Sequence, residues 1–368
     1  MPSDSNIDFV DIVKGLGIIG LITAHSLSTY LYQIGFYREP HVEWSFFSYM
    51  IATARQLIDF CPRLFLLVSG YILSLRYPIS ISNLHAFYKK RLLRICLPLS
   101  VWLPVYYLMD GKFTLTKLMA DIVFIRGSIH FWFIWAILIN YLLFPGMLSL
   151  ENRFLRIGPS SVNHRRYVAI LLILLAISSF VNNIIPVSVT SSKFITYTLN
   201  HRILIIPDSI CFFAIGIYMA RIGGTHMSVF LCPSRYRILI LALATCAAAI
   251  VSCFHQSFDS SFLHRTIRTM LYLACLFSTL SMVPVICSVI MNTRNGIARV
   301  MEQLGRSSYG IFLGHMAVLN ATHAVLDLTF KFSPATDIFP LLLITATVCF
   351  LPALIKKKNS ISTLLGYS

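Results

Sequence analysis

Charged residues are scarce in this chain of 368 residues. Asp, Glu, Lys and Arg together make up 12% of it, whereas hydrophobic residues make up 57%. A soluble domain of this length has no interior large enough to bury so much apolar surface, so most side chains must have lipid as their solvent. The composition therefore excludes a soluble globular protein and predicts a protein that crosses a membrane several times.

Features that mark separate domains or a cleaved leader are also missing. The chain has no Ser/Gly-rich linker, no long polar block and no internal repeat. The N-terminal MPSDSNID has no Lys or Arg, and no A-x-A cleavage site follows the first apolar run, so we expect that run to be retained as a helix. We expect a single membrane domain over residues 1–368, with a helical bundle over about 8–355 and a cytoplasmic tail over 356–368.

The cysteines and basic residues lack the arrangements that bind metals or nucleic acids. Most of the nine cysteines lie inside apolar runs, and there is no CxxC and no Cys/His cluster at metal-ligand spacing. No soluble segment carries a basic face with interleaved aromatic residues. The sequence therefore predicts no metal, no disulfide framework and no nucleic-acid partner.

Apolar runs near the length of a membrane span recur along the whole chain. A helix needs about twenty apolar residues to cross the hydrocarbon core of a bilayer. The runs predict an all-α bundle of about ten transmembrane helices, which we place at residues 9–32, 46–75, 92–109, 130–150, 167–186, 203–220, 236–254, 267–291, 306–328 and 338–355.

Basic residues are distributed unevenly between the loops that connect these predicted spans. The positive-inside rule assigns loops rich in Lys and Arg to the cytoplasm. This predicts a membrane protein with both termini in the cytoplasm, and a net charge of +16 that reflects topology and attraction to anionic lipid. The basic loops and tail contain Arg76, Lys89, Lys90, Arg91, Arg94, Arg153, Arg156, Arg165, Arg166, Arg221, Arg235, Arg237, Arg294, Arg299, Arg306, Lys356, Lys357 and Lys358.

The first predicted span, DIVKGLGIIGLITAH, carries three ionisable residues on one helical face. Lys14 and His25 are eleven positions apart, which leaves them about 20° from alignment and about 16 Å apart along a helix axis, and Asp11 lies one turn before Lys14. Ionisable groups in contact with hydrocarbon cost several kcal/mol, so we expect this stripe to face the bundle interior. In an alternative interpretation Lys14 reaches the membrane surface, Asp11 pairs with it, and His25 bonds a neighbouring helix.

The second span repeats charges every four residues, in RQLIDFCPRLF. Arg55, Asp59 and Arg63 form a predicted ladder in which one carboxylate can pair with two guanidinium groups. Pro62 is expected to loosen the helix beside it. The surplus positive charge either meets Asp11 or an anionic substrate, or belongs to an ion-paired structural ladder.

The segment HAFYKKRLLRICLP (85–98) leads into the third span. Arg91 and Arg94 are one helical turn apart at its predicted cytoplasmic start, so their guanidinium groups form a clamp suited to phosphate oxygens. The alternative is that they are an ordinary positive flank of a span.

In this order, the motifs resemble those of the acyltransferase-3 family, whose members are membrane enzymes that transfer acyl groups to cell-surface glycans. The resemblance covers about residues 8–355. It depends on Lys14 and His25 as Arg/Lys-x10-His, LFLLVSGYIL (64–73) as F-x-x-SG-[FY], Arg91 and Arg94 as Arg-x-x-Arg, HFWFI (130–134) as [HL]WF, and GRSSYGIFLGH (305–315) as G-x-x-SY-x-[IL]-[YF]-L-x-H. Two positions depart from the family pattern, since Lys14 stands where many members have Arg and Phe312 replaces a common Tyr.

The resemblance implies an O-acyltransferase that moves an acetyl group from cytoplasmic acetyl-CoA to a hydroxyl of a polysaccharide or lipid-linked glycan, such as O-antigen, capsule or exopolysaccharide. Acetyl-CoA would be the co-substrate, and no metal is expected. Arg91 and Arg94 would bind the nucleotide end of the donor, whose pantetheine arm would reach His25 along a channel beside the first helix. His25 would act with Lys14 and Asp11, either as a general base or as a nucleophile that is acylated first.

Further polar residues are implied as candidates that orient the acceptor or stabilise the oxyanion. Each of them is also compatible with an interhelical hydrogen bond or an interfacial aromatic. They are Arg55, Asp59, Arg63, Ser69, His130, Trp132, Ser308, Tyr309 and His315.

Two functions of other classes share several of these features. A transporter or flippase for lipid-linked sugars would also have buried Arg and Asp, but we find no repeated pair of broken helices, and a cytoplasmic arginine clamp has no evident task there. A glycan polymerase would be expected to carry a large extracytoplasmic loop, which the predicted spans do not leave room for.

Overall fold

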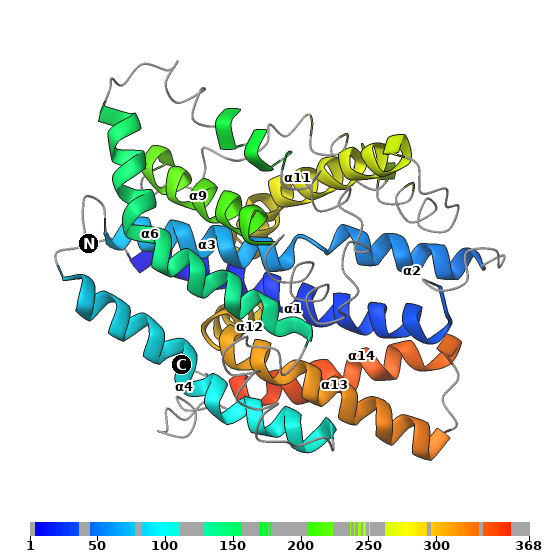
Figure 1. Ribbon diagram of the computed structural model, residues 1–368. Helices are drawn as coiled ribbons and strands as arrows, with labels where there is room; N and C mark the ends of the chain where they lie inside the picture. Colours follow the sequence, from blue (N-terminus) through cyan, green and yellow to red (C-terminus); the bar gives the residue numbers. More distant parts are fainter. Residues whose placement is uncertain are drawn as a thin grey trace, which may run out of the picture. The chain divides into compact units, whose positions relative to one another are not determined.

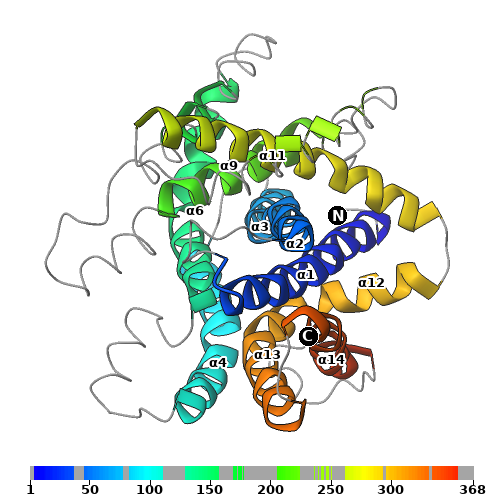
Figure 2. The same cartoon turned by 90° about the vertical axis from the view of Figure 1, so that its right-hand side faces the viewer.

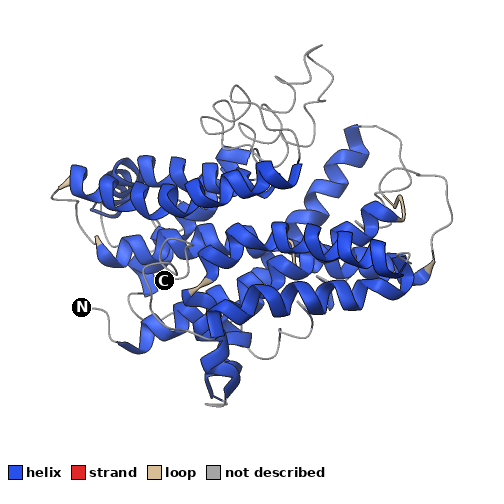
Figure 3. Cartoon of the chain, turned by 90° about the horizontal axis from the view of Figure 1, so that it is seen from below, coloured by secondary structure: helices blue, strands red, loops and turns tan. Residues whose placement is uncertain are grey.

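The structure is a computed structural model in which every element of the described residues is helical. It describes residues 4–36, 45–77, 83–110, 129–156, 205–223, 262–292, 296–330 and 334–354, with scattered helical positions within 169–177 and 236–250. The elements are α1 (Asp4–Gln33), α2 (Phe46–Leu57), α3 (Cys61–Arg76), α4 (Leu84–Asp110), the 3₁₀ turn η1 (Ile129–Phe131), α6 (Trp132–Arg156), α9 (Ile205–Gly223), α11 (Phe262–Asn292), α12 (Gly296–Arg306), α13 (Ser308–Phe330) and α14 (Pro334–Leu354), as Figures 1 and 3 show.

Five stretches of the described residues are long and apolar enough to cross a membrane. They are Phe9–Gln33, Phe46–Arg76, Leu84–Met109, Trp132–Arg153 and Ser308–Leu326. The prediction of a helical membrane protein is confirmed. The number of about ten spans stays a prediction, and the predicted spans 167–186 and 236–254 lie mostly outside the described residues.

The chain divides into two compact units, and the expectation of a single membrane domain stays a prediction. The first unit contains residues 3–62 and 228–368, and the second contains residues 63–227. In the first unit α1 packs against α2, α11, α12, α13 and α14. Figure 2 shows α1 crossing the middle of this unit, with α2 on one side and α12, α13 and α14 on the other. A helix surrounded in this way offers its polar residues protein partners in place of lipid.

Two glycines bring α1 and α12 into close contact. A Cβ added to Gly15 would collide with the backbone carbonyl of Met301, and one added to Gly305 would collide with the carbonyl of Asp11. Small residues at a helix crossing let the backbones approach closely, which is a common packing device of membrane helices. The crossing places the last turn of α12 beside the first turns of α1.

The predicted span 46–75 is interrupted, which corrects the expectation of one continuous helix. Residues 58–60 form a turn between α2 and α3, in which the Asp59 N–H donates to the Gln56 carbonyl over 3.2 Å and the Cys61 N–H donates to the Ile58 carbonyl over 3.3 Å. Pro62 has no N–H to donate, and its ring would clash with the carbonyl four residues before it. The proline is tolerated in the first turn of α3, so the chain ends α2 early and starts a new helix.

The second unit contains α3, α4, η1, α6 and α9, with α6 packed against α4 and α9. Its core is rich in aromatic residues, and Phe87 stacks on Phe144 with ring centroids 5.9 Å apart. A Cβ on Gly70 would collide with the Phe213 carbonyl, and one on Gly216 with the Leu67 carbonyl, so glycines also allow the close contact of α3 and α9.

The start of the third span and the helix α12 differ from the prediction. The third span was expected to begin at residue 92, but α4 begins at Leu84, so Arg91 and Arg94 lie two turns inside the helix. Helix α12 was not predicted, because it is short and amphipathic: it buries Leu304 and exposes Ile297 and Val300. A search for apolar runs cannot detect such a helix.

Candidate active site

The centre of the candidate site in the first unit is a pair of histidines on α1 and α13. The rings of His25 and His315 have centroids 5.0 Å apart and are tilted by 48°. His315 is fully buried, and His25 is partly buried. The two residues are 290 positions apart in the chain, so only the packing of α13 on α1 brings them together. Two imidazoles in contact inside a membrane span can exchange hydrogen bonds and protons with a substrate.

The backbone of α13 determines how the ring of His315 is oriented. Its Nδ1 lies 2.7 Å from the carbonyl oxygen of Phe312. A carbonyl oxygen only accepts hydrogen bonds, so Nδ1 must carry the hydrogen and donate it. The Phe312 side chain also contacts the His315 ring, with centroids 5.8 Å apart. The orientation of His315 is therefore set by its own helix.

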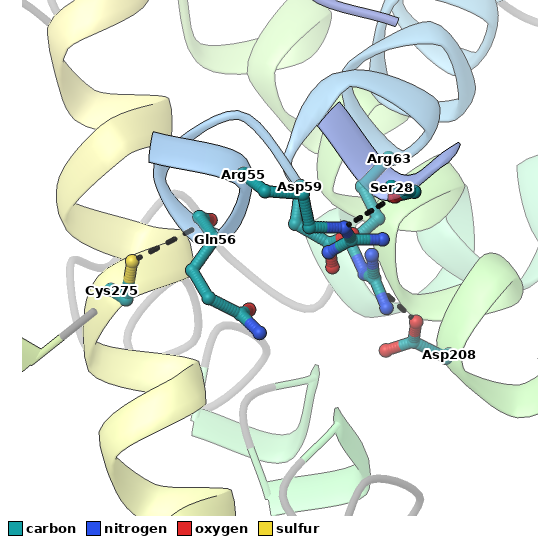
Figure 4. Close-up of polar contacts among 7 residues, drawn as sticks. All are labelled: Ser28, Arg55, Gln56, Asp59, Arg63, Asp208 and Cys275. Atoms are coloured by element: carbon teal, nitrogen blue, oxygen red, sulfur yellow. Dashed lines mark hydrogen bonds and ion pairs between the residues drawn. The ribbon is translucent and has the colours of Figure 1, made fainter. Parts of the chain in front are cut away.

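An ion pair at the end of α2 belongs to the surroundings of His25. Arg55 Nη1 lies 2.6 Å from Asp59 Oδ1, and Arg55 Nε donates to the hydroxyl of Ser28 on α1 over 3.2 Å (Figure 4). Arg55 and Asp59 both act electrostatically on His25. The Ser28 contact is one helical turn beyond His25, so it fixes the guanidinium group beside that histidine. Arg55 and Asp59 are four residues apart, so this pair is the one that the predicted ladder contained.

The other two ionisable residues of the predicted α1 stripe form a separate cluster. Lys14 Nζ lies 2.5 Å from Asp11 Oδ1, and Arg306 Nε donates to Asp11 Oδ2 over 3.2 Å. Arg306 also pairs with Glu302, one turn earlier on α12. Asp11 is buried, and its carboxylate lies between the two cations Lys14 and Arg306, which offset the cost of burying its charge. Two acidic and two basic side chains balance one another at this crossing, where Lys14 lies about 16 Å along α1 from His25.

The third member of the predicted ladder has a partner on a different helix. In the second unit Arg63 Nε donates to Asp208 Oδ2 of α9 over 3.1 Å, as Figure 4 shows. Asp208 is buried beside Ser209, whose hydroxyl accepts a hydrogen bond from Asn140 of α6 over 3.1 Å. Arg63 is thus part of a polar contact among α3, α6 and α9.

The two arginines of α4 differ in their surroundings. Arg91 is buried, and its guanidinium carbon lies 5.9 Å from the ring centroid of Phe87 and 5.7 Å from that of Tyr141. Its Nε has no hydrogen-bond partner in the part of the chain that the structure describes. Arg94 is exposed. Arg91 therefore stacks against aromatic rings, whereas the side chain of Arg94 lies at the surface.

The remaining candidate residues are spread over both units. In the second, His130 is buried against Tyr106, with centroids 5.4 Å apart, Trp132 packs edge-on against Phe133, and Ser69 is partly buried on α3. In the first, Ser308 is buried at the start of α13, and Tyr309 is partly buried beside it. Among the acceptor candidates that the structure describes in the first unit, His315 has a ring that contacts His25.

Sequence reasoning missed three residues that form these contacts. Arg306 was grouped with the loop charges, although it follows the first residue of the motif 305–315. Glu302 and Asp208 were not selected. A signal existed for Asp208, because a carboxylate inside an otherwise apolar run requires a cationic partner. No group of three possible metal ligands occurs among the described residues, and the expectation that no metal is needed stays a prediction.

The fold and these polar clusters define a helical membrane protein with reactive groups inside its spans. The acyltransferase-3 model, which describes an acyltransferase domain, matches residues 7–354, so the chain belongs to this family. It is therefore a membrane acyltransferase. No curated protein sequence and no solved structure shows significant similarity to the chain.

Proposed function

We propose that this protein transfers an acetyl group from cytoplasmic acetyl-CoA to a hydroxyl of a cell-surface or lipid-linked polysaccharide. In this proposal it lies in the bacterial inner membrane with both termini in the cytoplasm. The observation that carries the proposal is the contact of His25 with His315, with the Arg55–Asp59 pair beside them. A histidine that acts as base or nucleophile in acyl transfer must present one ring nitrogen to the reacting groups, and neighbouring side chains can hold it in that orientation.

The donor is assigned to the arginines of α4 on grounds of charge. Coenzyme A carries phosphate groups, and guanidinium groups bind phosphate through charge-assisted hydrogen bonds. Arg94 is exposed and is proposed to contact a phosphate directly. Arg91 is buried without a carboxylate among its described contacts, so an anion bound nearby would offset the cost of its buried charge.

His25 is proposed to carry the chemistry by one of two routes. As a general base it takes the proton of the acceptor hydroxyl while that oxygen attacks the thioester carbonyl. As a nucleophile it is acylated first and passes the group to the acceptor. Membership of an acyltransferase family supports either route over a transporter or flippase, and no observation on the described residues favours the latter.

Donor binding can be measured separately from transfer. We expect purified protein in nanodiscs to bind acetyl-CoA, and Arg94→Ala to weaken this binding by about tenfold because one charged hydrogen bond is lost. Lys89→Ala is the matched control, since it removes one positive charge from an exposed position of the same helix. Equal binding by the two variants would contradict the donor site.

The acceptor can be tested in cells. We expect surface polysaccharide from cells that contain the protein to release acetate after mild base, and polysaccharide from cells without it to release less. Complementation with His25→Ala should not restore the acetate. Translocation of a lipid-linked sugar by purified protein, without any transfer of acetyl, would support a flippase instead.

A further inference from the structure

The hydrogen on the His315 ring is assigned by its contact with the backbone. Nδ1 donates to the Phe312 carbonyl, 2.7 Å away. In a neutral imidazole only one nitrogen carries hydrogen, so the other nitrogen, Nε2, has a lone pair and accepts. His315 therefore presents a hydrogen-bond acceptor whose direction is set by α13 itself.

This ring lies directly against His25. Centroids 5.0 Å apart bring the edges of the two rings within contact distance. An imidazole that acts as a base or nucleophile needs its lone pair on the nitrogen that faces the substrate, and a hydrogen-bond partner at the other nitrogen fixes that tautomer.

We propose that His315 is a positioning residue for His25, and this inference rests on the proposed function of His25 in acyl transfer. In the reacting state of this proposal the His25 ring turns within its contact with His315 until one of its nitrogens donates to His315 Nε2, a hydrogen bond that the two rings do not make in the structure itself. The other His25 nitrogen is then unprotonated and faces the reacting groups. This role differs from orienting the acceptor or stabilising the oxyanion, which the family motif alone left open for His315.

The proton balance of the base route is simple. The acceptor hydroxyl gives its proton to the free nitrogen of His25 while its oxygen forms a bond to the thioester carbonyl carbon. The carbon–sulfur bond then breaks, and His25 returns the proton to the sulfur, so coenzyme A leaves as a thiol. His315 keeps its hydrogen bond to His25 throughout and neither gains nor loses a proton.

The contact of α1 with α13 does not depend on His315 Nε2. Gln33 of α1 donates to the ring of His323 on α13, about two turns further along both helices. The Nδ1 bond of His315 lies entirely within α13. Removal of the Nε2 acceptor alone should therefore leave the helices packed, which separates a positioning role from a structural one.

Two substitutions separate the two nitrogens. In His315→Asn the side-chain amide can still donate to the Phe312 carbonyl, but no atom reaches the place of Nε2. In His315→Gln the longer side chain can place its oxygen near Nε2 and accept from His25. A positioning role predicts that His315→Gln is the more active variant, and a structural role predicts the opposite order.

The assay uses the protein in nanodiscs with acetyl-CoA as donor and the polysaccharide and glycolipid fraction of the host membrane as acceptor. Release of the coenzyme A thiol gives kcat and the KM for acetyl-CoA. We expect His315→Asn to lower kcat by about 10²-fold with little change in KM, because the general base loses its orientation. We expect the kcat of His315→Gln to be about tenfold higher than that of His315→Asn.

Equal activity of the two variants, or higher activity of His315→Asn, would overturn the positioning role. Loss of the folded state or of acetyl-CoA binding in both variants would also overturn it, because His315 would then be structural. His25→Ala is measured in parallel. If His25→Ala retains transfer, the proposed function of His25 fails, whereas an inactive His25→Ala with equal His315 variants rejects the positioning role alone.

Discussion

The two polar clusters along α1 use similar residues in different ways. At the crossing with α12, Asp11 is paired with Lys14 and Arg306, and Arg306 is paired with Glu302, so four charges balance. About 16 Å along the helix from Lys14, His25 contacts His315 beside a single ion pair. The first arrangement is a closed network of ion pairs. The second holds imidazole rings, which can change protonation during a reaction.

The comparison teaches that the spacing of charges along α1 does not by itself define an active site. Lys14 and His25 share one face of the helix, yet Lys14 pairs with the carboxylate one turn before it. The charges that act on His25 include those of Arg55 and Asp59, which the chain delivers from the interrupted second span. We therefore expect substitutions in the His25 cluster to act mainly on the rate of transfer, and substitutions in the Asp11 cluster to act mainly on stability.

The largest effect is expected for His25→Ala. Loss of the base or nucleophile should lower the rate of acetyl transfer by about 10²–10⁴-fold while the protein stays folded and binds acetyl-CoA. His85→Ala, at an exposed position of α4, is the control and should leave transfer unchanged. The measurement is the rate of thiol release by the two purified variants. Comparable rates would show that His25 is not needed for transfer, so the His25 cluster would not differ from the Asp11 cluster in this respect.

The next effect concerns the close crossing of α1 and α12. Gly305→Ala places a methyl group against the Asp11 carbonyl, so the helices must separate, at a cost of about 3 kcal/mol. Gly296→Ala, at the other end of α12, meets no atom within 4 Å and should change stability by less than about 1 kcal/mol. Thermal unfolding of both variants in detergent measures the difference. Matching midpoints would show that the crossing is looser than the structure indicates.

A smaller effect is expected for Asp11→Ala. The substitution leaves Lys14 and Arg306 without their common carboxylate and should destabilise the protein by about 1–2 kcal/mol, which is less than a fully buried pair because Arg306 is 44% exposed. Glu302→Ala, in the same network, should cost under about 1 kcal/mol. The midpoints of thermal unfolding rank the two changes. If Asp11→Ala abolished transfer without lowering stability, the cluster would be catalytic.

The smallest effect is expected for Lys14→Arg. Many family members carry Arg at this position, and a guanidinium group can keep the pair with Asp11, so transfer should stay within about threefold of the original protein. Lys14→Met provides the contrast, because it keeps a side chain of similar length and removes the charge. Transfer and unfolding are measured on both. A loss of transfer with Lys14→Arg as large as with Lys14→Met would mean that the shape of the ammonium group matters.

Much of the helical architecture could be predicted from the sequence. Predicted spans that begin at residues 9, 130, 267 and 338 correspond to α1, α6, α11 and α14. A long apolar run can be recognised within one segment, and in lipid such a segment forms a helix because its backbone groups must bond to one another. Pro62 also predicted that the second span would be disturbed near residue 62. The amphipathic helix α12 was missed, because Arg299, Glu302, Gln303 and Arg306 interrupt its apolar residues and no apolar run marks it.

The sequence predicted the residues of the candidate site and its pairs within one helical turn, but not its contacts between helices. His25, Arg55 and Asp59 were selected because ionisable groups inside a span require protein partners. The Arg55–Asp59 pair belongs to the predicted ladder and is present in the structure. The bond of Arg55 to Ser28 and the contact of His25 with His315 depend on how α1, α2 and α13 pack. Arg63 shows the limit most clearly: its spacing suggested Asp59 as partner, and the structure gives it Asp208 on α9.

By itself, the sequence determined that this protein is helical, spans a membrane and carries the motifs of a membrane acyltransferase, because hydropathy and short motifs are properties of single segments. Only the tertiary structure decided that Asp11 is shared by Lys14 and Arg306, and that His315 lies against His25. Asp11 and Lys14 are one helical turn apart, but Arg306 and His315 are each separated from their partner on α1 by most of the chain. A contact between distant segments exists only where helices pack closely enough for their side chains to meet.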